Sequence, residues 1–430
     1  MNIAFLSPGT GSYYCGACMR DNALAKSLTA AGHEVSLLPM YLPMQLDDPE
    51  IAPQSEIFFG GINVFLQQKI PLFRHAPAWL DHLLNAKKLL RAAAGRSHMT
   101  SPRDHGAMTA AMLDLAHSPF AKETEKLLRF LASNPPNLVV LSNALLAGFT
   151  PVLRQRLPQT KIITCFQGED SFLDGLPEPY HSQCWKAMHR HLKDADQLIA
   201  PSQFYADLMR DRLGDPDLPI AIMPNGVEPL RDVPAAPDRS NAPPVIGFLA
   251  RMIREKGLEV LVDAFIYLRR NLDHPNAQLH IAGSTGDHQL VASLKNKLEA
   301  AGLTPHVTWS PDLSHPEKAA FLSRLTLFSV PAIYHEAFGL YTVEALAAGI
   351  PLVLPNASAF PEIITTSQAG QLVEPKDPIA LATAWHALLD DAPTLTRFRE
   401  NALRASRDAY SCDTMRDRFL EIAEQEDAEA

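Results

Sequence analysis

The chain alternates strand and helix patterns in a fixed order, and that order restarts once in its second half. Residues 2–7 form an apolar run typical of a buried strand, a glycine-rich stretch follows at residues 8–16, and residues 17–31 have helical spacing. Another apolar run at residues 34–38 completes the unit. A strand, a glycine turn, a helix and a parallel strand open a doubly wound sheet. We therefore predict an α/β fold.

Further strand patterns extend both halves of the chain. We expect strands at residues 138–141, 161–165, 197–200, 220–223, 245–249, 278–282, 307–309, 327–330, 351–354 and 370–373. Residues 228–244 are rich in proline and carry no apolar periodicity, which indicates a linker. The sequence thus predicts two Rossmann-like doubly wound domains, at residues 1–227 and 245–405.

Length and charge narrow the classes of protein that this chain can be. A chain of 430 residues is too long for one ordinary core. The net charge of -10 gives nucleic acid no electrostatic attraction, so we expect no nucleic-acid partner. No apolar run reaches the roughly 18 residues of a bilayer span, and the first residues lack the pattern of a secretory signal. We expect a cytoplasmic protein.

The cysteines do not indicate a disulfide framework, because there are five in a long chain. Cys15 and Cys18 have the spacing of redox and zinc motifs, and a helix N-terminus would lower the pKa of Cys15. No second pair of Cys or His at ligand spacing accompanies them. We favour ordinary thiols over a metal or redox site, and predict no metal.

The motif HEAFGLYTVEALAAGIP at residues 335–351 carries the strongest functional signal. It follows an expected strand, so a glycine-bearing turn opens a helix where backbone N–H groups can hold a phosphate. With a helix from Leu340, Glu336 and Glu344 can address one cleft, where carboxylates accept bonds from sugar hydroxyls. The alternative is a cap-region acid and a solvated helix residue.

A second motif, GFLARMIREKG at residues 247–257, places two cations after the first strand of the second domain. Arg251 and Lys256 there could stabilise the negative charge of a departing diphosphate without a metal. The alternative is that both are surface cations near a turn.

Together these motifs resemble retaining glycosyltransferase family 4, which has the GT-B fold. Smaller matches are APS at residues 200–202, PNGV at 224–227 and HIAG at 280–283. The resemblance implies two domains facing a cleft that closes on donor binding, with a final helix at about 413–430 crossing back to the first domain. It also implies transfer of a sugar from a UDP-, GDP- or ADP-sugar to a glycan, lipid-linked or small-molecule acceptor, with retention of configuration and no further cofactor.

The resemblance also assigns roles to single residues. It implies that Glu344 binds the donor ribose, that Glu336 contacts the transferred sugar, and that Arg251 with Lys256 holds the diphosphate. The remaining donor contacts that it implies are Gly283, Phe338, Gly339, Leu340 and Thr342.

The first domain matches less closely. Its glycine loop has Tyr14 at the third glycine position of a dinucleotide motif, so NAD binding is not expected, but Gly11 and Gly16 remain expected cleft contacts. Where many family members carry a His, this chain has Gln167. Glu169 and Asp170 either take over part of its polar catalytic role or cap the following turn.

A basic segment interrupts the alternation at residues 69–105. It holds seven Lys or Arg and two Asp, with Trp79 and several leucines at roughly helical spacing. It is either a helical hairpin covering the first domain or a peripheral contact with the inner membrane face that docks the acceptor.

Two other functions share the predicted fold. One is nucleotide-sugar epimerisation or a phosphorylase reaction, although the spaced glutamates favour transfer. The other is a nucleotide-sugar-binding protein without catalysis, a reading that Gln167 motivates.

Overall fold

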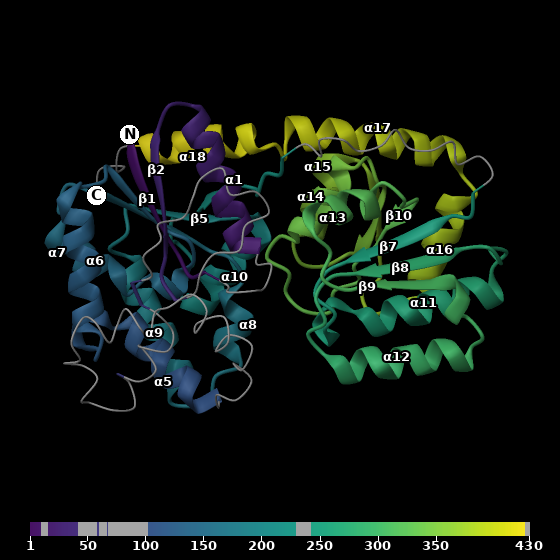
Figure 1. The fold of residues 1–430 in the computed structure, drawn as a ribbon, viewed down its shortest axis with the longest axis horizontal. Helices are drawn as coiled ribbons and strands as arrows, with labels where there is room; N and C mark the ends of the chain where they lie inside the picture. Colours follow the sequence, from purple (N-terminus) through teal and green to yellow (C-terminus); the bar gives the residue numbers. More distant parts are fainter. Residues whose placement is uncertain (10–15, 42–57, 60–66, 68–101, 229–241, 426–430) are drawn as a thin grey trace. The chain divides into compact units, whose positions relative to one another are not determined.

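The computed structural model describes residues 1–9, 16–41, 58, 59, 67, 102–228 and 242–425 (Figure 1). The chain folds into two compact units, one of residues 1–223 with 415–430 and one of residues 224–414. The sequence-based expectation was 1–227 with 413–430, and 245–405.

The first unit contains a parallel sheet with the strand order β2-β1-β3-β4-β5-β6. Its strands are β1 (Asn2–Ser7), β2 (Glu34–Pro39), β3 (Leu138–Leu141), β4 (Lys161–Cys165), β5 (Gln197–Ala200) and β6 (Ala221–Ile222). Its helices are α1 (Gly16–Ala30), α5 (Pro102–Leu113), α6 (Ala121–Ser133), α7 (Phe149–Arg156), α8 (Glu169–Asp174), α9 (Tyr180–Leu192), α10 (Gln203–Leu213) and most of α18 (Cys412–Glu424).

Both faces of this sheet are buried, which explains why its strands are continuous apolar runs rather than alternating ones. Along β1, Ile3 and Phe5 belong to one core cluster, whereas Ala4 and Leu6 belong to another. Successive side chains of a strand point to opposite faces, so helices must cover the sheet on both sides.

The second unit repeats this plan with the order β12-β11-β10-β7-β8-β9, again all parallel. Its strands are β7 (Val245–Leu249), β8 (Gln278–Ala282), β9 (Val307–Ser310), β10 (Leu327–Phe328), β11 (Leu352–Pro355) and β12 (Gly370–Val373). Its helices are α11 (Leu258–Asn271), α12 (His288–Ala300), α13 (His315–Leu322), α14 (Leu340–Ala347), α15 (Phe360–Ser367), α16 (Pro378–Leu389) and α17 (Ala392–Asp408).

Figure 1 shows α11 and α12 below this second sheet and α14, α15 and α17 above it. One large apolar core joins these layers. Within it the buried indole of Trp385 donates to Ser329 Oγ at 2.8 Å, and Ser329 donates to the Val353 carbonyl at 2.8 Å. The indole N–H of Trp385 and the hydroxyl of Ser329 are therefore hydrogen-bonded, as their burial requires.

The predicted α/β fold is confirmed, and each expected strand coincides with an observed one. The patterns at residues 220–223 and 327–330 gave shorter strands than expected. Residues 229–241 of the expected linker, and residues 69–101 of the basic segment, lie outside the described residues.

Candidate active site

The candidate site of the second unit lies where the strand order reverses. β7 and β10 are neighbours, with Leu327 opposite Ile246 and Phe328 opposite Gly247, and successive strands spread outward from them in opposite directions. In a doubly wound sheet, the loops leaving the carboxyl ends of two such strands diverge and leave a crevice for a ligand. Lys256 follows β7 and Glu336 follows β10.

Close backbone packing brings these two loops together. The turn from Arg254 to Lys256 ends at Gly257, whose φ is +71°. A Cβ on Gly257 would lie 1.7 Å from the Pro331 carbonyl oxygen, so only glycine allows this approach. The amide of Ile333 donates to the Glu255 carbonyl at 2.9 Å, which holds the β7 loop against the β10 loop.

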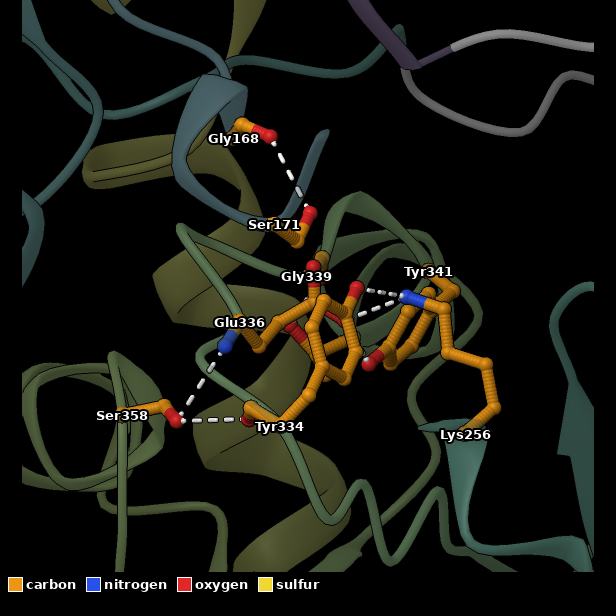
Figure 2. Close-up of polar contacts among 9 residues, drawn as sticks. Gly168, Ser171, Lys256, Tyr334, Glu336, Gly339, Tyr341 and Ser358 are labelled. Atoms are coloured by element: carbon orange, nitrogen blue, oxygen red, sulfur yellow. Dashed lines mark hydrogen bonds and ion pairs between the residues drawn. The ribbon is translucent and has the colours of Figure 1, made fainter. Parts of the chain in front are cut away.

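Glu336 is the centre of the polar cluster that results (Figure 2), and the residue is only 8% exposed. Its Oε2 accepts from Lys256 Nζ at 2.5 Å, Tyr341 Oη at 2.6 Å and Tyr334 Oη at 3.0 Å. Within the described residues its Oε1 makes no hydrogen bond, so that oxygen can still accept one from a ligand hydroxyl.

The two tyrosines also enclose the lysine. Lys256 Nζ lies 4.8 Å from the ring centroid of Tyr334 and 5.0 Å from that of Tyr341. It donates to Tyr334 Oη at 2.6 Å. Burial, and then the Glu336 carboxylate, raise the pKa of Tyr341 well above its ordinary value, so Tyr341 stays a neutral donor. A desolvated ammonium between two rings is a fixed positive charge.

Ser358 fixes the backbone beneath this cluster. The Glu336 amide donates to Ser358 Oγ at 3.2 Å, and Ser358 Oγ donates to the Tyr334 carbonyl at 3.2 Å (Figure 2). Because the loop backbone is tied on both sides of residue 335, the Glu336 carboxylate has a defined position.

The amino terminus of α14 follows directly. Gly339 is its N-cap with φ +83°, and a Cβ there would lie 3.4 Å from Glu336 Cγ. Thr342 is buried and donates from Oγ1 to the Gly339 carbonyl at 2.6 Å. Leu340 is the first helical residue and is half-buried, whereas the Phe338 ring is buried against Tyr410, with centroids 6.1 Å apart. These positions offer a ligand their backbone more readily than their side chains.

Glu344 has a different partner from Glu336. Its Oε1 lies 2.8 Å from Nζ of Lys318 on α13, and both side chains are mostly buried, at 18% and 14% exposure. The two glutamates of the motif are thus each paired with their own lysine. A paired and partly buried carboxylate is held in place to accept hydrogen bonds from a ligand diol.

Arg251 lies in a hollow beside this cluster. It is exposed, and within the described residues its side chain makes no hydrogen bond or ion pair. The hollow has a volume of about 490 Å³ and is lined by Arg251, Ile253, Arg254, Glu255, Gly286, Asp287, His288 and Gln289. The loops after β7 and β8 both contribute to it, so it lies at the same edge of the sheet as Lys256.

Gly283 follows β8, and its backbone conformation shapes the loop at this edge of the sheet. Its φ is +123°, and a Cβ there would lie 2.0 Å from the Ala250 carbonyl oxygen. The glycine therefore allows the loops after β7 and β8 to run side by side.

In the first unit, Glu169 and Asp170 are buried at the start of α8. Glu169 accepts from the amides of Gln167 and Ala144 at 2.8 Å each. Tyr205 Oη lies 3.1 Å from Glu169 Oε2 and 2.9 Å from Asp170 Oδ1, so one phenol hydrogen serves two carboxylates. Burial raises the pKa of Glu169, although these hydrogen bonds oppose the rise. Glu169 thus ties the residues before α8 to the loop after β3 and to α10, whereas α8 itself has no side-chain cap at Gly168.

The first unit has its own reversal point, between β1 and β3, and a buried network occupies it. Ser7 and Ser142, from the ends of those strands, both donate to Asp21 of α1. Arg20 donates to Asp21 Oδ1 at 2.8 Å and to the Ser142 carbonyl at 2.9 Å. The network ties α1 to both strands. Gly16 is exposed as the first residue of that helix, whereas Gly11 and Cys15 lie outside the described residues.

Comparison with known proteins decides the family. The model for glycosyl transferases group 1 matches residues 232–405, and that for glycosyltransferase family 4 matches residues 113–231. Together the two models span residues 113–405, and the chain belongs to the group 1 glycosyltransferases. Glycogen synthase from Mycobacterium tuberculosis is 31% identical over 213 residues, which are 50% of each chain. This chain thus spans about half the length of that relative.

Solved structures of other proteins have the same GT-B fold. Sucrose-phosphate synthase from Thermosynechococcus elongatus superposes with a TM-score of 0.68 at 18% identity, over 98% of both chains. Anabaena Alr3699/HepE in complex with UDP superposes with a TM-score of 0.67 at 15% identity, over 98% of this chain and 99% of that one. At such identities the likeness establishes the fold.

The sequence did not indicate several residues of the candidate active site. Tyr341 lies inside the recognised motif, and Tyr334 immediately before it, but nothing in the sequence indicates that their hydroxyls meet at Glu336. Lys318 lies in a separate helix, so its pairing with Glu344 has no local signal.

Of the cysteine pair that the sequence analysis considered, Cys18 is a buried free thiol.

Proposed function

We propose that this chain transfers a sugar from a nucleoside-diphosphate sugar to an acceptor with retention of anomeric configuration. The supporting observation is the convergence of Lys256, Glu336 and the amino terminus of α14 at the strand-order reversal of the second unit. All three lie within the second unit.

The proposed roles follow from the charges. The leaving diphosphate gains negative charge as the glycosidic bond breaks, and Lys256, Arg251 and the α14 amides stabilise that charge without a metal. The pairing with Glu336 at 2.5 Å keeps Lys256 in place beforehand. Fixing a cation in advance avoids the cost of reorganising it during the reaction.

Glu336 and Glu344 would bind the two ends of the donor. The Glu336 Oε1 accepts a hydroxyl of the transferred sugar, and Glu344, held by Lys318, accepts the ribose diol. The donor is a UDP-, GDP- or ADP-sugar, and Alr3699/HepE, with the same fold, was solved with UDP. Retention requires the acceptor to attack from the face that the diphosphate leaves.

The acceptor is a glycan, a lipid-linked sugar or a small molecule. Among the described residues no helix is both long and apolar enough to cross a bilayer. We also propose that residues 69–105 make a peripheral membrane contact. Binding to vesicles with anionic lipid, lost when Lys87, Lys88 and Arg91 are changed to Ala, would test it.

Donor binding tests the proposed function. The wild-type protein is heated with UDP-, GDP- and ADP-sugars, and we expect one donor class to raise Tm and to release its nucleotide slowly. Glu344→Ala should lose the Tm rise, whereas Glu299→Ala, an exposed change on α12 of the same unit, should keep it. Lys256→Met should retain most binding but lower kcat/KM on the order of 100-fold, because it removes charge stabilisation in the transition state.

The product distinguishes transfer from its alternatives. NMR of the anomeric proton should show the configuration of the donor. An inverted product would contradict retention, an epimerised nucleotide sugar would indicate the epimerase, and a Tm rise without any turnover would indicate a binding protein.

A further inference from the structure

A cluster of two histidines and an aspartate lies in the second unit, outside the candidate active site. His274 is in the loop between α11 and β8, His386 is in the last turn of α16, and Asp390 is the residue that caps that helix. We propose that His274, His386 and Asp390 form a binding site for a divalent transition-metal ion, with Zn²⁺ the best match to its ligands.

The geometry brings one donor atom from each residue to a common point. His274 Nε2 and His386 Nδ1 each lie 3.4 Å from a carboxylate oxygen of Asp390, and the three ligand atoms lie within 4.8 Å of one another. His386 and Asp390 are four residues apart on one helical turn, so they face the same side. The rings of His274 and His386 are 5.1 Å apart and inclined at 71°.

The two ring nitrogens that face the aspartate are buried, and neither makes a hydrogen bond within the described residues. The His274 side chain is 12% exposed and that of His386 is 32% exposed. Buried polar atoms are normally hydrogen-bonded, so two such nitrogens directed at one carboxylate need an explanation. A cation between them satisfies both lone pairs and the carboxylate together.

The ligand set indicates which ions fit. Two imidazoles and one carboxylate suit Zn²⁺ and its first-row neighbours, whereas Mg²⁺ and Ca²⁺ prefer oxygen ligands. Zn²⁺ binds such ligands at about 2.0–2.2 Å in a tetrahedral arrangement, and the three ligand atoms here lie close enough to surround one ion, within 4.8 Å of one another. The 59% exposed side chain of Asp390 leaves the site open to solvent, so water can complete the coordination.

The position of the cluster indicates a structural role. His274 precedes β8 and therefore lies at the amino edge of the sheet, and α16, after β12, ends at that edge because it runs back against the strands. Lys256 and Glu336 lie at the carboxyl edge. A bound ion would link the α11–β8 loop to α16, and it would make no contact with the proposed donor site.

Metal titration of untagged, chelator-treated full-length protein tests the site. With Zn²⁺ we expect one bound equivalent and a Tm rise of roughly 5 °C at saturation. With Co²⁺ we expect visible absorption typical of tetrahedral coordination, and with Mg²⁺ no change. His386→Ala should lose the bound equivalent, and Asp390→Asn should weaken binding about tenfold or more.

His306→Ala is the matched control, because that partly exposed histidine of the same unit is not in the cluster. It should keep the bound equivalent and the Tm rise. Equal Zn²⁺ binding by wild type, His386→Ala and Asp390→Asn would overturn the proposal, as would a Tm that Zn²⁺ leaves unchanged. Donor-induced stabilisation should persist after chelation, so failure here is separable from failure of the proposed function.

Discussion

At the scale of single residues, the partner of a buried carboxylate decides its electrostatic environment. Glu336 keeps a cationic partner within 2.5 Å and stays a defined acceptor. Within the described residues, Glu169 instead accepts hydrogen bonds from backbone amides and from the Tyr205 phenol, and burial raises its pKa. A buried glutamate is thus paired with a cation in the second unit and with neutral hydrogen-bond donors in the first.

Glu169→Gln should remove a pH-dependent loss of stability. Because the folded-state pKa of Glu169 is raised, the native state binds the proton more tightly than the unfolded state. Stability from this group is therefore greatest below the unfolded pKa and falls as pH rises toward the folded pKa. The urea midpoint of the variant, relative to wild type, should increase from pH 4 to pH 7. Parallel profiles would contradict the assignment of burial as the dominant effect.

At the scale of elements, the short turn before α11 determines where Lys256 lies. Gly257 ends that turn in the left-handed region and contacts the backbone at Pro331. The ends of β7 and β10 set the direction in which the two loops leave the sheet. The contact between Gly257 and Pro331 sets the distance between those loops.

Gly257→Ala should lower the free energy of unfolding far more than Gly302→Ala, although both glycines have a similar positive φ. Gly302 has φ +74° but nothing within 4 Å of a Cβ, so Gly302→Ala should cost only the left-handed strain, about 1 kcal/mol. Gly257→Ala adds a clash with the Pro331 carbonyl and should cost about 3 kcal/mol or more. Chemical denaturation of both variants measures the difference. The kcat/KM for sugar transfer should fall in Gly257→Ala alone, because that change displaces Lys256, and equal behaviour of the two variants would contradict this account of the loop.

At the scale of the whole molecule, the end of the chain completes the first unit. After the second unit, α18 returns to pack Met415, Phe419 and Ile422 into the core that contains Phe5. The rings of Phe5 and Phe419 have centroids 6.2 Å apart. The first unit therefore depends on residues that follow the second unit in the chain.

Phe419→Ala should destabilise the first unit by about 3–5 kcal/mol, because it leaves a cavity beneath β1. Glu421→Ala, on the exposed side of α18, is the control and should change little. Calorimetry should show that the transition of the first unit moves to a lower temperature. The transition of the second unit, which the donor stabilises, should keep its Tm. Loss of both transitions together would show that the units do not unfold separately.

Sequence patterns alone determined the α/β class, the strands and the motif that carries Glu336 and Glu344, because strand periodicity and glycine turns are local properties. Tertiary structure decided the partners: Lys256 and both tyrosines around Glu336, Lys318 beside Glu344, and the approach of His274 to His386. Lys256, Lys318 and His274 come from elements that are separate in the chain from those of their partners. The order of strands in the sheet, which no local pattern encodes, brings these elements together.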